Sequence, residues 1–141
     1  MKRSASAHWE GDLKQGKGTI SAESGALSDQ PYGFNTRFEQ GSGTNPEELI
    51  GAAHAGCYSM ALSMILGESG FTPAAIDTTA SVTLEKVDDG FAITAIHLDV
   101  SAKVPGADEA AFNKAANAAK DGCPVSKVIN AEISMNAELR D

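Results

Sequence analysis

Basic residues, cysteines and long apolar runs are all scarce in this chain of 141 residues. Lysine and arginine number 11 against 19 aspartates and glutamates, which leaves a net charge of -8, and no basic cluster stands out. Because an acidic surface repels phosphate backbones, the composition argues against a nucleic-acid partner.

Segments directed to a membrane are also lacking. The longest weakly polar stretch, from Ile50 to Leu66, is interrupted by His54, Ser59 and Ser63, so it predicts a buried helix rather than a membrane span. The N-terminal residues are polar and contain no apolar core of a signal peptide. We therefore expect a cytoplasmic protein with no membrane partner.

What is present is an ordinary globular composition, with 42% hydrophobic and 21% charged residues. The length is enough for one domain with its own hydrophobic core, and neither a repeat nor a linker interrupts it. We expect a single domain over residues 1–141.

The N-terminal part shows the two-residue alternation that is typical of strands. Strands are expected at residues 4–10, 18–22 and 34–39, with a turn at residues 31–33 before the last. In this last strand Phe34, Thr36 and Phe38 share one face, and Arg37 lies on the other. The first forty residues therefore predict a small antiparallel sheet.

A strong helix start follows at residues 44–48. Thr44 or Asn45 can cap the helix, Pro46 suits its first position, and Glu47 and Glu48 favour the positive end of its dipole. Apolar residues at steps of three and four then form one stripe. The stripe consists of Leu49, Ala53, Cys57, Met60, Ala61, Met64 and Ile65.

The rest of the chain predicts a hairpin, a helix and a strand. Gly67 and Gly70 end the long helix, and residues 78–87 and 91–100 flank an Asp-Gly turn. Asp108 caps an alanine-rich helix, a short helical turn follows Pro124, and residues 131–139 alternate as a closing strand. This order predicts an α+β fold with an N-terminal antiparallel sheet, a long central helix and a C-terminal antiparallel hairpin followed by a helix and a strand.

Only two cysteines are present, Cys57 and Cys123. A structural disulfide is unusual in a reducing compartment, which leaves an inert core residue, a metal ligand or a redox thiol as interpretations of each. Cys57 lies about three turns inside the long helix, beyond the reach of its dipole. A reactive Cys57 therefore needs a nearby cation, for which His54 and Arg37 are the candidates. Cys123 precedes a short helix, whose free N–H groups favour a thiolate.

Several longer motifs narrow these interpretations. They are AHWEG (7–11), PYGFNTRF (31–38), GTNPEELIGAAHAGC (43–57), SMAL (59–62), GFTP (70–73) and GCPVS (122–126). With them the chain resembles, over essentially its whole length, the osmotically inducible protein C (OsmC) branch of the family that also contains the organic hydroperoxide resistance (Ohr) proteins.

The resemblance implies residue roles. Cys57 resembles the peroxidatic cysteine and Cys123 the resolving cysteine, Arg37 matches the arginine that activates the thiolate, and Glu48 matches the carboxylate that orients this arginine. It also implies a thiol-dependent peroxidase for organic hydroperoxides in oxidative and osmotic stress defence. The expected assembly is an intertwined homodimer around two long helices, and the expected reductant is a lipoyl-type dithiol. We expect no cofactor and no resident metal.

Helix geometry adds one inference about Glu48. It lies nine positions before Cys57 in the same helix, which places the two side chains about 180° apart around the axis and about 13 Å apart along it. If both serve one active site, that site combines residues from two chains. The alternative is that Glu48 only caps the helix.

Two other functions compete with a peroxidase. His54, Cys57 and Cys123 could supply three ligands to a zinc ion. Alternatively, the protein is a non-enzymatic binder with a hydrophobic cleft, in which Met60 and Met64 would suit a promiscuous pocket. Metal analysis and peroxide turnover distinguish these alternatives.

Overall fold

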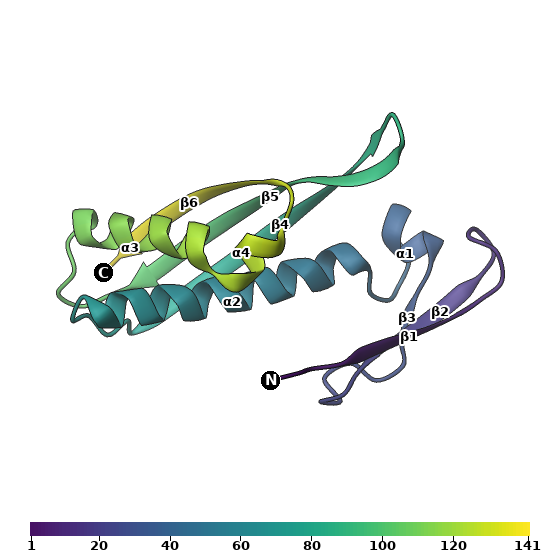
Figure 1. Ribbon diagram of the computed structural model, residues 1–141, viewed down its shortest axis with the longest axis horizontal. Coiled ribbons are helices and arrows are strands. Elements are labelled where there is room, and N and C mark those ends of the chain that lie inside the picture. Colours follow the sequence, from purple (N-terminus) through teal and green to yellow (C-terminus); the bar gives the residue numbers. More distant parts are fainter. The chain divides into compact units, whose positions relative to one another are not determined.

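A computed structural model describes residues 1–141 of the protein. Its contacts divide the chain into unit 1, Met1–Leu49, and unit 2, Ile50–Asp141, and each unit is described by itself. The α+β class predicted from the sequence is confirmed, because both units carry a sheet together with helices (Figure 1).

Unit 1 contains a three-stranded antiparallel sheet. Its strands in spatial order are β1 (Ala5–Glu10), β2 (Lys17–Ala22) and β3 (Gln30–Tyr32). Gly18 of β2 pairs with both Trp9 and Tyr32, and a Cβ atom at Gly18 would collide with the two rings. The first two predicted strands are therefore confirmed, and a glycine allows their aromatic neighbours to meet.

Residues 34–39 form a helix rather than the predicted third strand. Helix α1 (Phe34–Phe38) begins where the Thr36 hydroxyl accepts a hydrogen bond from the Gly33 N–H (2.9 Å) and donates one to the Gly33 carbonyl (3.0 Å). The rings of Phe34 and Phe38 then meet one helical turn apart, with their centroids at 4.9 Å. So short an alternation fits either structure, and these local contacts favour the helix.

Helix α2 (Pro46–Glu68) begins as predicted. Asn45 is its cap, because the Asn45 side-chain oxygen accepts a hydrogen bond from the Glu48 N–H at 2.8 Å. The helix ends before Gly70, which has a φ of +86°, and the Phe71 N–H returns to the Leu66 carbonyl at 2.9 Å. Glycine tolerates this left-handed conformation without strain.

The buried side of α2 differs from the predicted stripe. Within unit 2 the fully buried residues of α2 are His54, Tyr58, Leu62 and Leu66. Met60 and Met64, expected on the buried stripe, are 76% and 60% exposed. Because α2 is apolar on nearly all sides, hydrophobic spacing could not identify its core face.

By length and composition alone, α2 is apolar enough to cross a membrane. Its interior contacts are polar as well as apolar, however, since the Tyr58 hydroxyl donates to the Ala116 carbonyl at 3.1 Å and His54 is hydrogen-bonded and fully buried. A helix with such specific partners is the core helix of unit 2, as the sequence predicted.

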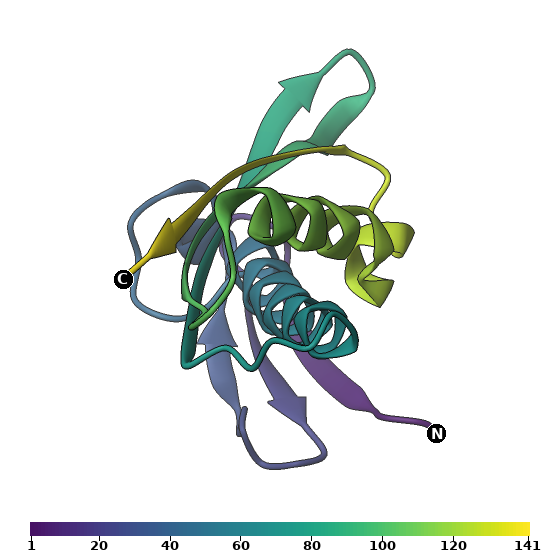
Figure 2. The ribbon, with the colours of Figure 1, turned by 90° about the vertical axis from the view of Figure 1, so that its left-hand side faces the viewer.

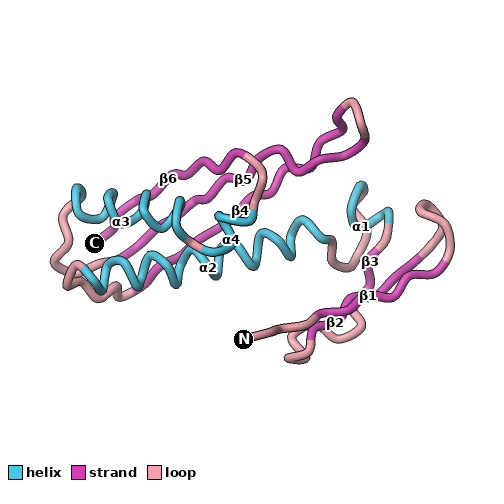
Figure 3. The backbone as a smooth tube through the Cα atoms, in the orientation of Figure 1, coloured by secondary structure: helices cyan, strands magenta, loops and turns pink.

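Unit 2 packs helices on one face of a three-stranded sheet (Figure 2). Its strands in spatial order are β4 (Ala75–Val87), β5 (Gly90–Lys103) and β6 (Glu132–Arg140), and its further helices are α3 (Glu109–Gly122) and α4 (Pro124–Val128). The β4–β5 hairpin is antiparallel, as predicted, whereas β6 joins β5 in parallel after the crossover through α3 and α4. The tip of the hairpin extends past β6 because β6 pairs only with residues 95–103 (Figure 3).

The core of unit 2 lies between these layers. Ile96 and Leu98 of β5 and Phe112 of α3 are fully buried. Asp108 caps α3 as predicted, accepting a hydrogen bond from the Ala111 N–H at 2.7 Å. The predicted apolar face of α3, with Phe112 at its start, is the face that packs into this core.

Candidate active site

Unit 2 brings the two cysteines together. Cys57 is partly buried on α2, Cys123 is fully buried between α3 and α4, and both are free thiols. Cys57 packs against the buried cluster that contains Cys123, and the Cys123 side chain and the Val125 backbone are both close enough to shift the pKa of Cys57. The structure therefore places side by side two thiols that lie on separate helical segments of the chain.

The Gly-Cys-Pro break positions Cys123. The Cys123 N–H completes the last turn of α3 by donating to the Ala119 carbonyl at 3.0 Å, and Pro124 then starts α4. The Cys123 sulfur acts as the cap of α4, accepting a hydrogen bond from the Ser126 N–H at 3.3 Å. One residue thus ends one helix and begins the next, which fixes its thiol at the junction.

The surroundings of Cys57 favour the neutral thiol. Burial raises the pKa of Cys57 above its ordinary value, and the Cys123 side chain raises that pKa further, while the hydrogen bond from the Val125 backbone partly offsets both effects. No positive charge of unit 2 acts on this sulfur. Unit 2 on its own therefore does not activate Cys57.

His54 is not the cation that the sequence offered as a candidate. It is fully buried, and burial lowers its pKa below the ordinary value for histidine, which keeps the imidazole neutral. Its Nε2 atom lies 2.7 Å from the Ser126 hydroxyl, which in turn lies 3.1 Å from the Cys123 sulfur. No group of three histidine, cysteine or acidic side chains has the geometry to hold a metal ion.

In unit 1, Arg37 is held by Glu47. The Arg37 Nε and Nη2 atoms donate to the same Glu47 carboxylate oxygen at 3.0 and 2.8 Å. The guanidinium carbon also lies 5.5 Å from the centre of the Phe38 ring. Glu47 is buried whereas Arg37 is half-exposed, so a fixed carboxylate orients a cation that still has Nη1 available for another acceptor.

The prediction that Glu48 orients Arg37 is wrong. Glu48 is exposed and accepts a hydrogen bond from the Thr44 hydroxyl at 2.6 Å. Consecutive residues of a helix point about 100° apart, so only one of the two adjacent glutamates can face α1. No signal in the sequence separates Glu47 from Glu48, because both follow the same cap.

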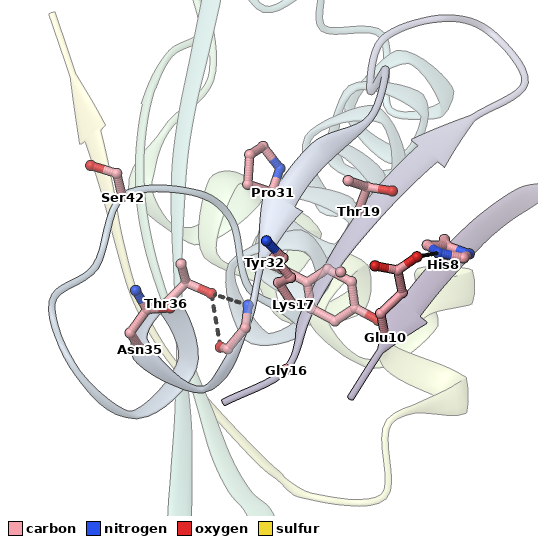
Figure 4. A pocket seen from close by; sticks show the side chains of 12 residues that line it. His8, Glu10, Gly16, Lys17, Thr19, Pro31, Tyr32, Asn35, Thr36 and Ser42 are labelled. Atoms are coloured by element: carbon pink, nitrogen blue, oxygen red, sulfur yellow. Dashed lines mark hydrogen bonds and ion pairs between the residues drawn. The ribbon is translucent and has the colours of Figure 1, made fainter. Parts of the chain in front are cut away.

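Two of the hollows in unit 1 are lined by residues of α1. The smaller, of about 60 Å³, is lined by Arg37 and largely apolar neighbours that include Trp9, Phe34 and Phe38. The larger, of about 470 Å³, is lined by polar groups, with the Thr36–Gly33 hydrogen bonds at one side and the His8–Glu10 pair at another (Figure 4). Of these two hollows, Arg37 lines only the smaller.

Comparison with known proteins assigns the chain to a family. Residues 39–138 match the family model described as OsmC-like protein. The chain belongs to this family. Peroxiredoxin OsmC of Escherichia coli (strain K12) is 62% identical over 140 residues, covering 99% of this chain and 98% of that protein. The organic hydroperoxide resistance protein OhrB of Bacillus subtilis (strain 168) is 30% identical over 124 residues, covering 87% and 89%.

Solved structures share the fold. The crystal structure of OhrB of Bacillus subtilis aligns with a TM-score of 0.70 and 23% identity, covering 96% of this chain and 98% of that chain. An OsmC-like protein of unknown function from Vibrio cholerae aligns with a TM-score of 0.76 and 16% identity, covering 98% and 99%. The predicted family and its fold are therefore confirmed.

Proposed function

We propose that this chain reduces organic hydroperoxides to alcohols in stress defence, with Cys57 as the attacking thiol and Cys123 as the resolving thiol. Membership of the OsmC-like family and the identity to Peroxiredoxin OsmC make the chain a cysteine-based peroxidase. The observation that carries the assignment to these two residues is that the only two thiols of the chain are neighbours, Cys57 packing against the buried cluster that contains Cys123.

The reaction follows from thiol chemistry. The Cys57 thiolate attacks the distal oxygen of the hydroperoxide, the O–O bond breaks, and the alkoxide leaves and is protonated to the alcohol. Cys57 is thereby oxidised to a sulfenic acid. Cys123 attacks the sulfenic sulfur, a disulfide forms, and water is released. An external dithiol then returns both thiols to the reduced state by exchange.

Arg37 supplies the charge that unit 2 lacks. Because burial holds the pKa of Cys57 high, the thiolate needs a cation beside it, and a guanidinium also stabilises negative charge on the breaking O–O bond. Glu47, in place of Glu48, keeps this guanidinium oriented. Two observations support this role: Glu47 fixes Arg37 in place, and no cation of unit 2 lowers the pKa of Cys57.

The site is proposed to combine two chains of a homodimer. Ten positions of a helix separate Glu47 from Cys57, which corresponds to about 15 Å along the helix axis. Because this distance is long for a contact within one helix, we propose that the arginine held by Glu47 acts on Cys57 of a partner chain. The exposed methionines Met60 and Met64 on apolar α2 give such a partner a surface to cover. Replacing both with glutamate should yield a monomer by light scattering.

The aromatic surroundings of Arg37 favour an organic peroxide over hydrogen peroxide. Trp9, Phe34 and Phe38 line the small hollow beside the guanidinium and offer apolar contact to an alkyl or aryl group. A lipoyl-type dithiol as reductant, which the family resemblance implies, and a cytoplasmic location complete the proposal, because an external dithiol reduces the disulfide by exchange and a reducing compartment keeps thiols free.

Steady-state peroxidase assays test this proposal. With dihydrolipoamide as reductant, the wild-type protein should consume cumene hydroperoxide faster than hydrogen peroxide, and glutathione should support less turnover than the dithiol. Phe34→Ala is expected to weaken the preference for the aromatic peroxide by raising its KM. A protein that turns over neither peroxide with either reductant would contradict the proposal.

A further inference from the structure

A continuous hydrogen-bonded chain runs through the core of unit 2 to the proposed resolving thiol. The Cys123 sulfur lies 3.1 Å from the Ser126 hydroxyl, and this hydroxyl lies 2.7 Å from His54 Nε2. His54 and Cys123 are fully buried, and Ser126 is 8% exposed. Three side chains from α2, the α3–α4 junction and α4 are thus brought together in a site closed to bulk water.

The second nitrogen of His54 has no partner. The Nδ1 atom is buried and makes no hydrogen bond. A buried polar atom without a partner is costly, so its retention in a hydrophobic core calls for a reason. With the ring proton on Nδ1, Nε2 is an acceptor, and the chain can run in one direction, from the Cys123 S–H to the Ser126 oxygen and from the Ser126 O–H to Nε2.

We propose that Ser126 and His54 carry away the proton of Cys123 when this residue attacks the oxidised Cys57, an inference that rests on the proposed peroxidase function. The Cys123 sulfur forms the S–S bond as the S–O bond of the Cys57 sulfenic acid breaks. The Cys123 proton passes to Ser126, whose own proton passes to His54 Nε2. The hydroxide leaves from the partly exposed Cys57, and the proton that His54 then releases neutralises it, so that one water forms for each disulfide.

A dedicated acceptor is needed here because Cys123 is sealed from solvent. A thiol at the surface can lose its proton to water or buffer, whereas a buried thiol can lose it only to a neighbour within hydrogen-bonding distance. Ser126 touches Cys123 and thereby links it to His54. Acting through this hydroxyl, His54 is a positioning and proton-accepting residue for the second chemical step and has no part in the first.

Few other ionisable groups reach the relay. Cys57 and Tyr58 lie beside it on α2, and burial, with a smaller effect of Cys123, raises the pKa of Tyr58 so that the phenol stays neutral. The faces of β4 and β5 that pack against α2 present apolar residues and Thr78. Lys120 and Lys127 of α3 and α4 form no hydrogen bond or ion pair with the relay. His54 is therefore the group whose titration would show in the second step.

Single-turnover oxidation tests the relay. Reduced protein is mixed with one equivalent of cumene hydroperoxide, and the sulfenic acid is trapped with dimedone at successive times. His54→Gln and Ser126→Ala should leave peroxide consumption within about twofold of wild type but slow disulfide formation by about tenfold or more, so that trapped sulfenic acid accumulates. The glutamine side chain keeps an amide near Ser126 but cannot accept a proton.

The pH profile separates proton transfer from packing. In the wild type, disulfide formation should slow as the pH falls through the pKa of His54, which burial places below about 6.5. In His54→Gln the plateau above that pKa should be lost, and the rate should instead rise with hydroxide concentration throughout. Ser126→Thr keeps the hydroxyl and should restore most of the rate that Ser126→Ala loses.

The chain contains a matched control. His97 Nδ1 lies 2.7 Å from the Ser134 hydroxyl, an exposed pair of the same chemistry on β5 and β6. His97→Gln and Ser134→Ala should leave both steps unchanged. Disulfide formation at the wild-type rate and with the wild-type pH profile in His54→Gln would overturn the relay, whereas failure of the wild type to consume peroxide would instead overturn the proposed function.

Discussion

Unit 1 and unit 2 hold complementary halves of the proposed chemistry. Unit 1 carries charge, in the Arg37–Glu47 pair beside an aromatic hollow. Unit 2 carries the two free thiols, and a buried serine and a neutral histidine lie behind Cys123. Arg37, the proposed activating cation, and Cys57, the thiol that it would activate, thus belong to different units of the fold.

This division bears on how the enzyme avoids unwanted oxidation. A thiol whose pKa burial raises is a poor nucleophile, so Cys57 stays inert whenever the arginine is not beside it. In the proposed mechanism, reactivity then depends on the presence of the Arg37 guanidinium beside the Cys57 sulfur.

Removing the nucleophile should have the largest effect. Cys57→Ser is expected to abolish reduction of organic hydroperoxide, because no other thiol is placed to attack. Cys123→Ser should still consume one equivalent of peroxide per chain and then stop, because the first attack needs only Cys57. Titrating each reduced variant with increasing amounts of peroxide and quantifying the residual peroxide distinguishes the two variants. Equal stoichiometry for both would show that the two thiols are not specialised.

Removing the cation should come next. Arg37→Ala is expected to slow the first step by about 100-fold or more, a loss typical of a group that stabilises charge in the transition state. The pKa of Cys57 should also rise, so alkylation by iodoacetamide in a Cys123→Ser background should level off at higher pH than with Arg37 present. Unchanged alkylation profiles would mean that unit 1 does not supply the charge.

The two adjacent glutamates are expected to differ in their effect on the first step. Glu47→Gln should slow the first step by about tenfold, because the guanidinium loses the charged oxygen that accepts two of its hydrogen bonds. Glu48→Gln, one residue away and bonded to Thr44, should leave the rate within about twofold. Stopped-flow peroxide consumption under single-turnover conditions measures both. A larger effect at Glu48 would restore the role suggested by the sequence.

The smallest effect concerns the start of α2, on which the charged pair depends. Asn45→Ala removes the side chain that caps the helix and should lower the free energy of unfolding by about 1 kcal/mol. Asn45→Ser keeps a capping oxygen and should cost less. Urea denaturation followed by circular dichroism measures the difference. Equal stability of the alanine and serine variants would indicate that the cap does not stabilise the helix.

Much of unit 2 could be predicted from the sequence because its signals are local and strong. The cap at Asp108, the apolar face of α3 and the alternation of β6 all appear in the structure as expected. The core face of α2 could not be predicted, because a helix that is apolar on nearly every side has no preferred face. Tertiary contacts of Tyr58 and Leu62 decide it.

The candidate site was predictable in its residue types but not in its pairings. Cys57, Cys123 and Arg37 stood out from their motifs, yet the choice between Glu47 and Glu48 depended on the position of α1, which the sequence suggested was a strand. Ser126 was overlooked because a serine in the first turn of a short helix usually only caps or faces solvent. The proposed role of Ser126 could be inferred only from the structure, which places its hydroxyl between Cys123 and His54.

The pairing of Cys57 with Cys123 is tested most directly by identifying the product of one turnover. Reduced protein is treated with one equivalent of cumene hydroperoxide, alkylated without reductant, digested and analysed by mass spectrometry. We predict a peptide pair joined through Cys57 and Cys123, a monomer band for the undigested protein on a non-reducing denaturing gel, and one equivalent of cumyl alcohol. Two alkylated cysteines after full consumption of the peroxide, or a disulfide that joins two chains instead, would contradict the account.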